Sequence, residues 1–443
     1  MSRVAINVIM VDFIVCTENM KTALLAGTQS ACGKTTIMLA LLQYLKAQQH
    51  NVVSFKAGPD FLDPLWHQAI TGKYSYNLDT RMIGAANSQQ LLAKQALTAD
   101  VAVIEGVMGL FDGRSGVGES GSSAELAKVL QVPIFLVVDA KGMSGSIVPL
   151  VSGFCAYAEK MGVKISGIIA NRVGSAHHAS LLKTVLQEHQ QPPLIAWVEK
   201  DAPVLPERHL GLMQPSEVAL PDFLPFFHVE VADLVALFAE ADSHLGEQKP
   251  IQLLKGKKIA IAQDAACCFI YPVNLAFLRE QGAELVFFSP VAGDAIPNTA
   301  DAVWLPGGYP ELFVQALSIS KTWFSLGEFI EAGKPVLAEC GGAMLLGEAL
   351  IDLDGKSWAM ANILPFRSKM QTRLASLGYR EDKTGIKGHE FHHSVRESEQ
   401  KLEPYLQIDR GDQGVCYKNC RASYVHWYFA SAPEVISKWL SGN

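Results

Sequence analysis

The sequence lacks the features of a membrane protein, a nucleic-acid-binding protein and a disulfide-rich secreted protein. Its apolar run at residues 4–16 is interrupted by Asp12 and is too short to span a bilayer. No basic tract offsets the formal net charge of −7, which argues against a nucleic-acid surface. The eight cysteines include no C-x-x-C pair, and their scatter indicates a reducing compartment. We therefore expect a cytoplasmic protein without membrane or nucleic-acid partners.

The length of 443 residues and the hydrophobic content of 49% predict a globular chain of two or three domains. Residues 1–19 carry a single arginine and no small-residue cleavage site, so they make a poor signal peptide. Met20 stands directly before the first predicted strand. We therefore expect residues 1–19 to be a dispensable extension.

Residues 27–36 have the context of a phosphate-binding loop, because an apolar run precedes them and a segment with helical periodicity follows. Backbone N–H groups of such a loop converge on phosphates, and the helix N-terminus adds partial positive charge. We expect Lys34 to reach the β- and γ-phosphates of ATP and Thr35 to ligate Mg²⁺. The alternative is an ordinary strand–helix turn with a chance Gly-Lys-Thr, which the flanking pattern disfavours.

Five residues separate Gly27 from the Gly33-Lys34 pair, one more than the strict pattern has. This variant resembles the loop of dethiobiotin synthetase and related ATP-dependent ligases. The loop residues expected to bind the nucleotide are Thr28, Gln29, Ser30, Ala31, Cys32, Gly33, Lys34, Thr35 and Thr36.

From residue 21 to about 193, nearly continuous apolar strands alternate with helical stretches. This pattern predicts an α/β fold with a parallel sheet covered on both faces, whose ligands collect beyond the carboxyl ends of the strands. The predicted strands are 23–26, 52–56, 101–105, 134–139, 165–171 and 194–198.

Acidic side chains follow the second and third of these strands. Asp60 and Glu105 supply the hard oxygen ligands that Mg²⁺ prefers, and we expect them to join Thr35 in a metal site. Asp112 lies in the same loop as Glu105 and is expected to hold a second metal or to orient the substrate. A solvated loop carboxylate is the alternative for each acid taken alone.

Three motifs carry a more specific resemblance: Lys-Ala-Gly-Pro-Asp-Phe-Leu-Asp-Pro at 56–64, Asn-Leu-Asp at 77–79 and Glu-Gly-Val-Met-Gly-Leu-Phe-Asp-Gly at 105–113. They resemble signature stretches of the cobyrinic acid a,c-diamide synthase family, and residues 206–212 resemble a further one. The resemblance implies a dethiobiotin-synthetase-like P-loop domain over residues 20–239. Asn171 and Arg172 match the place where this superfamily reads adenine, although an Asn after a strand is usually a turn former.

The resemblance also implies a polycarboxylate substrate, a corrinoid or related tetrapyrrole. Such a substrate favours cations near the phosphate loop, and a solvated surface cation is the alternative for each. The residues expected at the substrate or synthetase site are Leu62, Asp63, Asp112, Lys56, Arg81, Arg114 and Arg208.

Residues 240–258 are polar and read as a linker to a second α/β domain over residues 259–443. In it, Cys340 stands between a predicted strand and a helix and is followed by two glycines, the pattern of a nucleophile elbow. Backbone N–H groups near Gly308 and Gly341 are expected to form an oxyanion hole that also binds glutamine. His426, in a strand-like apolar run, is the expected base.

This half resembles a class I glutamine amidotransferase domain of the cobyric acid synthase type, and in this branch the glutamate two residues after the histidine is missing. Here Tyr428 occupies that position. His389, Glu390 and His393 match the zinc-protease pattern H-E-x-x-H, which works only on a helix. Because Gly388 and Ser394 flank the motif, we expect a strand edge facing the substrate or the other domain.

Together the resemblances imply an ATP- and glutamine-dependent ligase that uses Mg²⁺. It would amidate the a and c acetate carboxylates of cobyrinic or hydrogenobyrinic acid through acyl phosphates, in cobalamin biosynthesis. Cobyric acid synthase, nickel-sirohydrochlorin a,c-diamide synthase and a non-catalytic nucleotide switch are the alternatives. The sequence is compatible with a homodimer.

Overall fold

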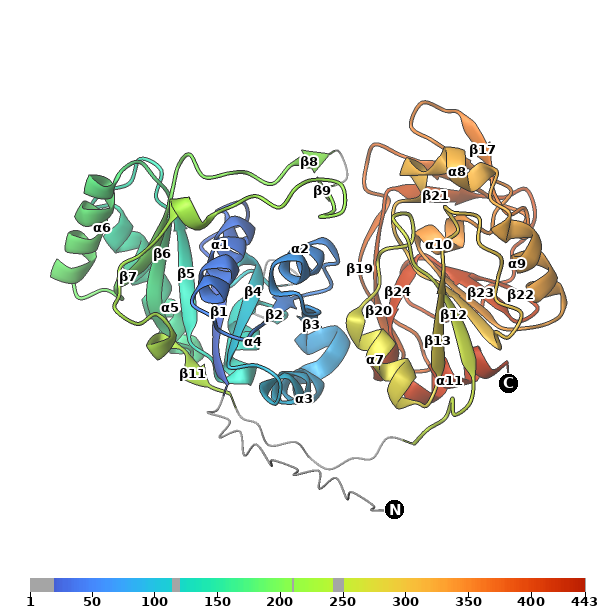
Figure 1. Ribbon diagram of the computed structural model, residues 1–443, viewed down its shortest axis with the longest axis horizontal. Coiled ribbons are helices and arrows are strands. Elements are labelled where there is room, and N and C mark those ends of the chain that lie inside the picture. Colours follow the sequence, from blue (N-terminus) through green and yellow to red (C-terminus); the bar gives the residue numbers. More distant parts are fainter. Residues whose placement is uncertain (1–19, 114–119, 209–210, 242–250, 443) are drawn as a thin grey trace, which may run out of the picture.

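The computed structural model describes residues 20–113, 120–208, 211–241 and 251–442, without side chains at 207, 208 and 211. The described residues form two α/β domains that face each other across a broad interface (Figure 1). The N-terminal extension at 1–19 lies outside the described residues. None of the helices in the described ranges is long and apolar enough to cross a membrane.

A nine-stranded sheet forms the centre of the first domain, in the order β10-β7-β6-β5-β1-β4-β2-β3, with β11 paired to β1. The strands from β1 to β7 pair in parallel with their neighbours. The short β10 pairs antiparallel with β7, and the short β11 pairs antiparallel with β1. The strands are β1 (Lys21–Gly27), β2 (Val52–Ala57), β3 (Tyr76–Leu78), β4 (Val101–Gly109), β5 (Ile134–Asp139), β6 (Ile165–Val173), β7 (Leu194–Glu199), β10 (Phe227–Val229) and β11 (Ala239–Glu240).

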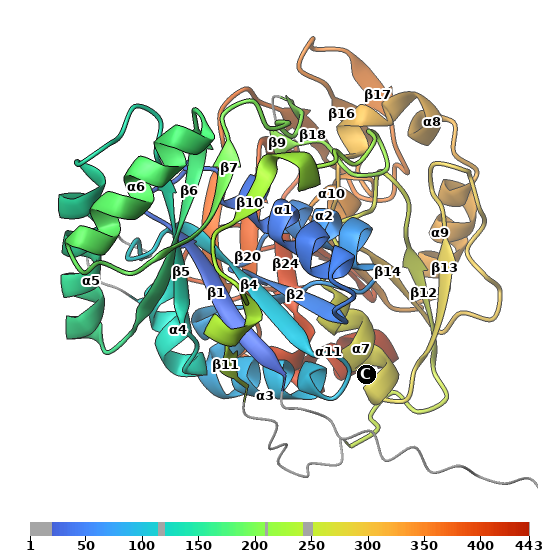
Figure 2. The same ribbon diagram turned by 60° about the vertical axis from the view of Figure 1, so that its left-hand side comes forward.

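Helices cover both faces of this sheet, as its nearly continuous apolar strands require. One face packs mainly against α1 and the other against α3 to α6 (Figure 2). The helices are α1 (Lys34–Ala47), α2 (Leu62–Thr71), α3 (Ala85–Ala96), α4 (Ser123–Leu130), α5 (Ile147–Met161) and α6 (Ala176–Glu188). All six predicted strands are confirmed, and β3 is an additional edge strand that its three residues did not reveal.

The second domain contains a six-stranded sheet in the order β13-β12-β14-β15-β23-β22, parallel except for β22. Its strands are β12 (Lys258–Ala262), β13 (Glu284–Phe288), β14 (Ala302–Leu305), β15 (Val336–Glu339), β22 (Val415–Tyr417) and β23 (Cys420–Ser423). The helices include α7 (Pro272–Glu280), α9 (Thr322–Glu331), the short α10 (Gly341–Met344) and α11 (Pro433–Ser441).

A three-stranded antiparallel sheet lies on the side of this domain that faces its neighbour (Figure 1). It consists of β19 (Ser376–Glu381), β20 (Lys387–His392) and β24 (Val425–Tyr428). The expectation that the His-Glu-Phe-His-His stretch forms a strand is confirmed, because β20 contains all but its last residue.

Apolar side chains from both domains form one small core at the interface. Met82 and Ile83 come from the first domain, and Tyr271 and Tyr428 come from the second. Tyr379 of β19 donates a hydrogen bond of 2.5 Å to a carboxylate oxygen of Asp79, and further contacts come from Lys94 with Glu280 and from Gln214 with the carbonyl of Ala265. These contacts join the two domains to each other.

Residues of both domains extend into the predicted linker at 240–258. Glu240 lies in β11 and pairs with Lys21, so it belongs to the first sheet. Leu254 is fully buried in the core of the second domain. The bounds of the linker stay a prediction.

Candidate functional site

The predicted phosphate-binding loop connects β1 to α1. Ala31 and Gly33 take left-handed backbone conformations, with φ of 59° and 92°. A Cβ at Gly33 would lie 1.9 Å from the amide nitrogen of Asn171, so only glycine fits there. The Nζ of Lys34 donates to the carbonyl of Met108 at 2.5 Å, which turns this cation toward the carboxyl end of β4. The loop thus presents backbone N–H groups, a helix N-terminus and one lysine to a common space.

Asn171 and Arg172 lie on β6 beside this loop. The Asn171 amide nitrogen donates to the carbonyl of Cys32 at 3.0 Å, and its oxygen accepts from the Arg172 N–H at 2.9 Å. Arg172 pairs with Asp139 at 2.5 Å. In this arrangement both residues brace the phosphate-binding loop, and adenine recognition by them stays a prediction.

An acidic cluster lies next to Thr35, at the carboxyl ends of β2 and β4. The Thr35 hydroxyl donates to Glu105 at 2.8 Å and approaches Asp63 at 3.4 Å. Lys56 pairs with Asp63 at 2.5 Å and with Glu105 at 3.2 Å. All three charged residues are buried, so Lys56 is fully engaged inside the cluster, which leaves it little freedom to bind a substrate.

Two carboxylates compete for one cation in this cluster. Burial, followed by the charge of Glu105, raises the pKa of Asp63 to about 7. Burial opposes ionisation of Glu105, but Lys56 and His67 outweigh it and lower its pKa to about 2. Burial alone would lower the pKa of Lys56, whereas its two acidic partners raise it, so this lysine stays charged. The cluster therefore places two carboxylates beside one buried lysine, and its oxygens are the hard ligands that suit Mg²⁺.

His67 is a site residue that the sequence reasoning missed. Its Nε2 lies 2.8 Å from Glu105, and its Nδ1 lies 3.0 Å from the Ser75 hydroxyl. The ring is fully buried. His67 stands four residues after Asp63 on α2, a spacing that puts both on one helix face and that could have revealed it.

The structure assigns Asp60 and Asp112 to turns. Asp60 accepts hydrogen bonds from the N–H groups of Leu62 and Asp63, at 2.7 and 3.3 Å, and so caps α2. Asp112 accepts from the N–H of Gly109 at 2.8 Å. The sequence predicted Asp60 beside Thr35, whereas in the structure Asp63 approaches the Thr35 hydroxyl and Asp60 accepts hydrogen bonds at the start of α2.

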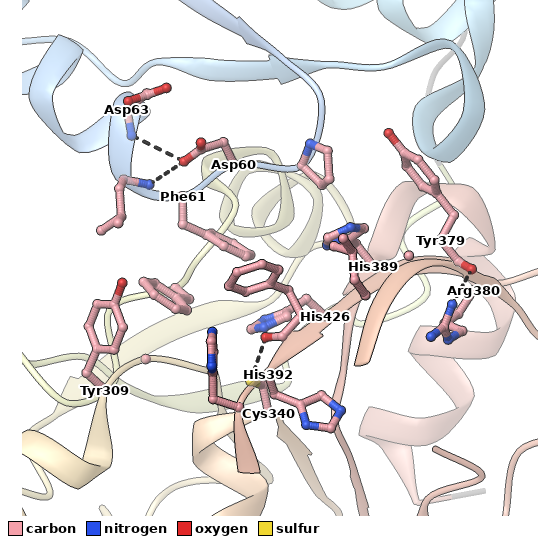
Figure 3. A pocket seen from close by; sticks show the side chains of 18 of the residues that line it. Asp60, Phe61, Asp63, Tyr309, Cys340, Tyr379, Arg380, His389, His392 and His426 are labelled. Carbon is pink, nitrogen blue, oxygen red and sulfur yellow. Dashed lines mark hydrogen bonds between the residues drawn. The ribbon is translucent and has the colours of Figure 1, made fainter. Parts of the chain in front are cut away.

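Cys340 occupies the tight turn between β15 and α10 (Figure 3). Its φ of 46° and ψ of −113° are the strained backbone of a nucleophile elbow. The Cys340 N–H donates to Ser423 at 2.7 Å, which removes it from any oxyanion hole. A Cβ at Gly341 would lie 3.0 Å from the Gly308 nitrogen, so these two glycines meet closely beside the thiol.

His426 projects from β24 toward the same point. A Cβ at Gly307 would lie 2.3 Å from the Cε1 of His426 and 3.2 Å from the Cβ of Cys340, so these three residues converge. Burial, followed by the neighbouring His389, lowers the pKa of His426 to about 3, and burial raises the pKa of the Cys340 thiol. Both groups are therefore uncharged, as a resting thiol–imidazole pair would be.

No carboxylate in the described part of the chain is hydrogen-bonded to the His426 ring, whose buried Nδ1 has no hydrogen-bond partner there. Tyr428, at the position of the missing glutamate, packs instead in the interdomain core. The buried Glu339, which directly precedes Cys340, accepts a hydrogen bond from the N–H of Trp427 at 3.2 Å.

Glu390, in the middle of the H-E-x-x-H match, joins Arg380 at 2.5 Å and His392 at 2.8 Å. Of the two histidines in the motif, His389 lies on β20 and His393 lies directly after that strand, so the two do not share a helix face. Within the described ranges, no three His, Cys, Asp or Glu side chains are grouped to hold a metal ion.

A cavity of about 810 Å³ lies between the domains and reaches both groups of residues. Asp60 and Asp63 line it from the first domain, and Cys340 and His426 line it from the second (Figure 3). Leu62 and Met108 also face it. One space thus connects the acidic cluster with the cysteine.

A groove of about 310 Å³ adjoins this cavity, and Tyr379, Arg380 and Arg410 line both. It adds Arg81 from the first domain and Lys387 from the second. The Arg81 guanidinium lies 5.0 Å from the centre of the Tyr379 ring. Of the other predicted substrate cations, Arg208 lies on β8 (Glu207–Arg208), and Arg114 is outside the described residues.

Comparisons with known proteins agree with this division. Residues 23–212 match the family model of the CobQ/CobB/MinD/ParA nucleotide binding domain, and residues 258–434 match that of the CobB/CobQ-like glutamine amidotransferase domain.

Three similar proteins are named cobyrinate a,c-diamide synthase. The one from Herminiimonas arsenicoxydans is 40% identical over 96% of this chain and 98% of its own length. Those from Priestia megaterium and Salmonella typhimurium are 35% and 36% identical, each over 94% of this chain and over 95% and 97% of their own lengths.

Proposed function

We propose that this chain, which belongs to the cobyrinate a,c-diamide synthase family, uses ATP and glutamine to convert two acetate carboxylates of cobyrinic acid, a and c, to amides. The observation that carries the proposal is the single cavity lined by both the acidic cluster and Cys340. A ligase of this kind needs one site that releases ammonia and another that activates a carboxylate.

In the second domain, the Cys340 sulfur attacks the side-chain carbonyl carbon of glutamine. His426 accepts the thiol proton and passes it to the leaving ammonia. The N–H groups of Gly308 and Gly341 are proposed to bind the oxyanion, a role supported by their close approach beside the thiol. Water then hydrolyses the thioester, which releases glutamate and restores the thiol.

In the first domain, a substrate carboxylate oxygen attacks the γ-phosphorus of ATP, and ADP leaves. Ammonia attacks the acyl phosphate carbon, phosphate leaves, and the nitrogen loses a proton to give the amide. The phosphate step is needed because a free carboxylate offers ammonia no adequate leaving group. Lys34 and the loop N–H groups are proposed to hold the phosphates, a role supported by the position of Lys34 at the start of α1, directly after the loop.

Thr35, Asp63 and Glu105 are proposed to hold Mg²⁺, and Asp60 to assist from its position on the cavity wall. When bound, Mg²⁺ would neutralise negative charge on the terminal phosphates. The proposal is supported by the three hard oxygen ligands that these side chains bring together beside the phosphate-binding loop.

The cavity matters because ammonia in bulk water at neutral pH is mostly protonated and then cannot attack. Apolar side chains such as Val107, Met108 and Met344 line the space between the two sites. Passage through this space would keep ammonia in its nucleophilic form.

A kinetic comparison distinguishes this ligase from a nucleotide switch. Glutamine hydrolysis is measured with and without ATP and cobyrinic acid. A ligase should release glutamate faster when both are present and should consume ATP in proportion to the amide formed. ATP turnover without any glutaminase activity would contradict the proposal.

Replacing Arg81 with alanine is expected to raise the KM for the macrocycle about tenfold, equivalent to about 1.4 kcal/mol of binding. The reason is that Arg81 lines the groove with Arg380, Lys387 and Arg410, where the carboxylates that are not reacting would bind. The kcat with ammonia should change little. Lys94→Ala, which removes an exposed cation at the interface but outside the groove, serves as the control. An unchanged KM in Arg81→Ala would remove the groove from substrate binding.

A further inference from the structure

Phe61, a residue of the first domain, contacts the catalytic histidine of the second. Its ring centroid lies 4.8 Å from that of His426 (Figure 3). It also stacks on Phe269 at 4.9 Å and on Tyr271 at 4.3 Å. No sequence motif of the second domain could reveal this contact, because Phe61 lies in the motif assigned to the synthetase site.

The segment that carries Phe61 belongs to the synthetase site. Asp60, the residue before it, caps α2, and Asp63, two residues after it, pairs with Lys56 and approaches Thr35. The Asn77 amide also holds the carbonyl of Asp60 at 2.7 Å. Asp63 lies in the first turn of α2, and Phe61 stands directly before that turn, so a shift of this turn changes the positions of both residues.

The His426 ring is held by packing and not by a hydrogen bond to a carboxylate. In the described part of the chain no carboxylate holds its ring, and its Nδ1 has no hydrogen-bond partner. Gly307 limits the ring on one side, and Phe61 and Phe269 lie against it. The commoner triad would fix the imidazole with a glutamate, whereas here aromatic contacts take that role and one of them comes from the other domain.

We propose that Phe61 is the positioning residue through which nucleotide and substrate at the synthetase site set the orientation of His426 toward Cys340. The inference rests on the proposed function. Occupation of the cluster at Thr35, Asp63 and Glu105 shifts the start of α2, and Phe61 transmits that shift to the imidazole ring. Glutamine is then hydrolysed quickly only when a carboxylate is ready to be amidated.

The resting state of the pair agrees with this coupling. Burial keeps His426 uncharged and the Cys340 thiol protonated in the arrangement described above. A change in the contact between Phe61 and His426 alters both the solvation of the ring and its aim at the thiol, and misplacement of about 1 Å in such a pair changes rates by about 100-fold.

The test uses the full-length chain with Phe61→Leu and Phe61→Ala. Glutaminase kcat is measured with and without ATP and cobyrinic acid, and ammonia-dependent amide synthesis is measured in parallel. We expect the stimulation of glutaminase by ATP and substrate to fall by at least about fivefold, the lower end of typical coupling. Ammonia-dependent synthesis should stay close to wild type, because the phosphate-binding loop and the acidic cluster are unchanged.

Two further variants separate positioning from a loss of interface stability. Tyr271→Phe removes the hydrogen bond of 3.2 Å to the Pro59 carbonyl but keeps the ring stacked on Phe61, so stimulation should persist. Phe61→Tyr keeps an aromatic ring on His426 and should restore most of the stimulation. Thermal unfolding of each variant identifies any that fails to fold. If Phe61→Ala does not fold, Phe61→Leu replaces it in the test, because leucine fills more of the space left by the ring.

Full stimulation of glutaminase by ATP and substrate in Phe61→Ala would overturn the inference. Loss of ammonia-dependent synthesis in a folded Phe61→Leu would also overturn it, because Phe61 would then take part in the synthetase chemistry itself. The proposed function fails separately, if the wild-type chain forms no amide with glutamine. A wild-type chain that forms amide but whose glutaminase ignores ATP and substrate would overturn the coupling alone.

Discussion

Replacing Cys340 with alanine is expected to lower glutamine-dependent amide synthesis by at least about three orders of magnitude, as removal of a covalent nucleophile does. The Cys340 sulfur is the only nucleophile at the elbow, and its N–H is already bonded to Ser423. Synthesis with added ammonia should continue near the wild-type rate, because the phosphate-binding loop and acidic cluster belong to the other domain. Amide formation is measured with each nitrogen source.

Cys420→Ala is the matched control, since it removes another fully buried thiol from the same domain without touching the cavity. Normal glutamine-dependent synthesis is expected in this variant. If ammonia does not rescue Cys340→Ala although the protein stays folded, the two domains do not act as separable sites.

Replacing Glu105 with glutamine is expected to lower synthesis by more than about 100-fold with either nitrogen source. The substitution removes the charge of a proposed metal ligand and also weakens the contact of that ligand with His67. Glu105 accepts from Thr35 and faces both Lys56 and His67. Glutamine keeps the shape of the side chain but not its charge, and Lys56 retains Asp63 as a partner. Rates are measured over a range of Mg²⁺ concentrations.

Glu280→Gln provides the control, because it removes an exposed interfacial carboxylate that lies outside the cavity. Little change is expected in it. Normal ammonia-dependent turnover in Glu105→Gln would exclude Glu105 from the synthetase site, whereas partial recovery at high Mg²⁺ would support its proposed role as a metal ligand.

Local sequence patterns predicted the strands and the turns that bear the site residues. The apolar runs of β1 and β15 end in glycine-containing turns. Such turns are recognisable in a sequence because glycine permits their tight backbone and because the functional residue stands at a fixed distance from it. The strand at His389 was also predictable, because glycine before the motif and serine after it disfavour a helix.

The contacts between segments far apart in the sequence were not predictable in this way. Asp60 and Asp63 are equivalent acids in one motif, and only the cap of α2 decides which of them stands by Thr35. Phe61 gains its role from a partner in the second domain, and the spacing from Asp63 on α2 could point to His67 but not to its partner Glu105 in β4. Their residue types alone carry no record of those partners.

The proposed double amidation is tested most directly by measuring the mass of the macrocycle after reaction with ATP, Mg²⁺ and glutamine. Cobyrinic acid, hydrogenobyrinic acid and nickel-sirohydrochlorin are compared as substrates. We expect cobyrinic acid to lose one mass unit at each of two amidations and the Cys340→Ala variant to give the same product only with ammonia. Four amidations would indicate a cobyric acid synthase, and an unchanged mass with ATP turnover would contradict the assignment of the substrate.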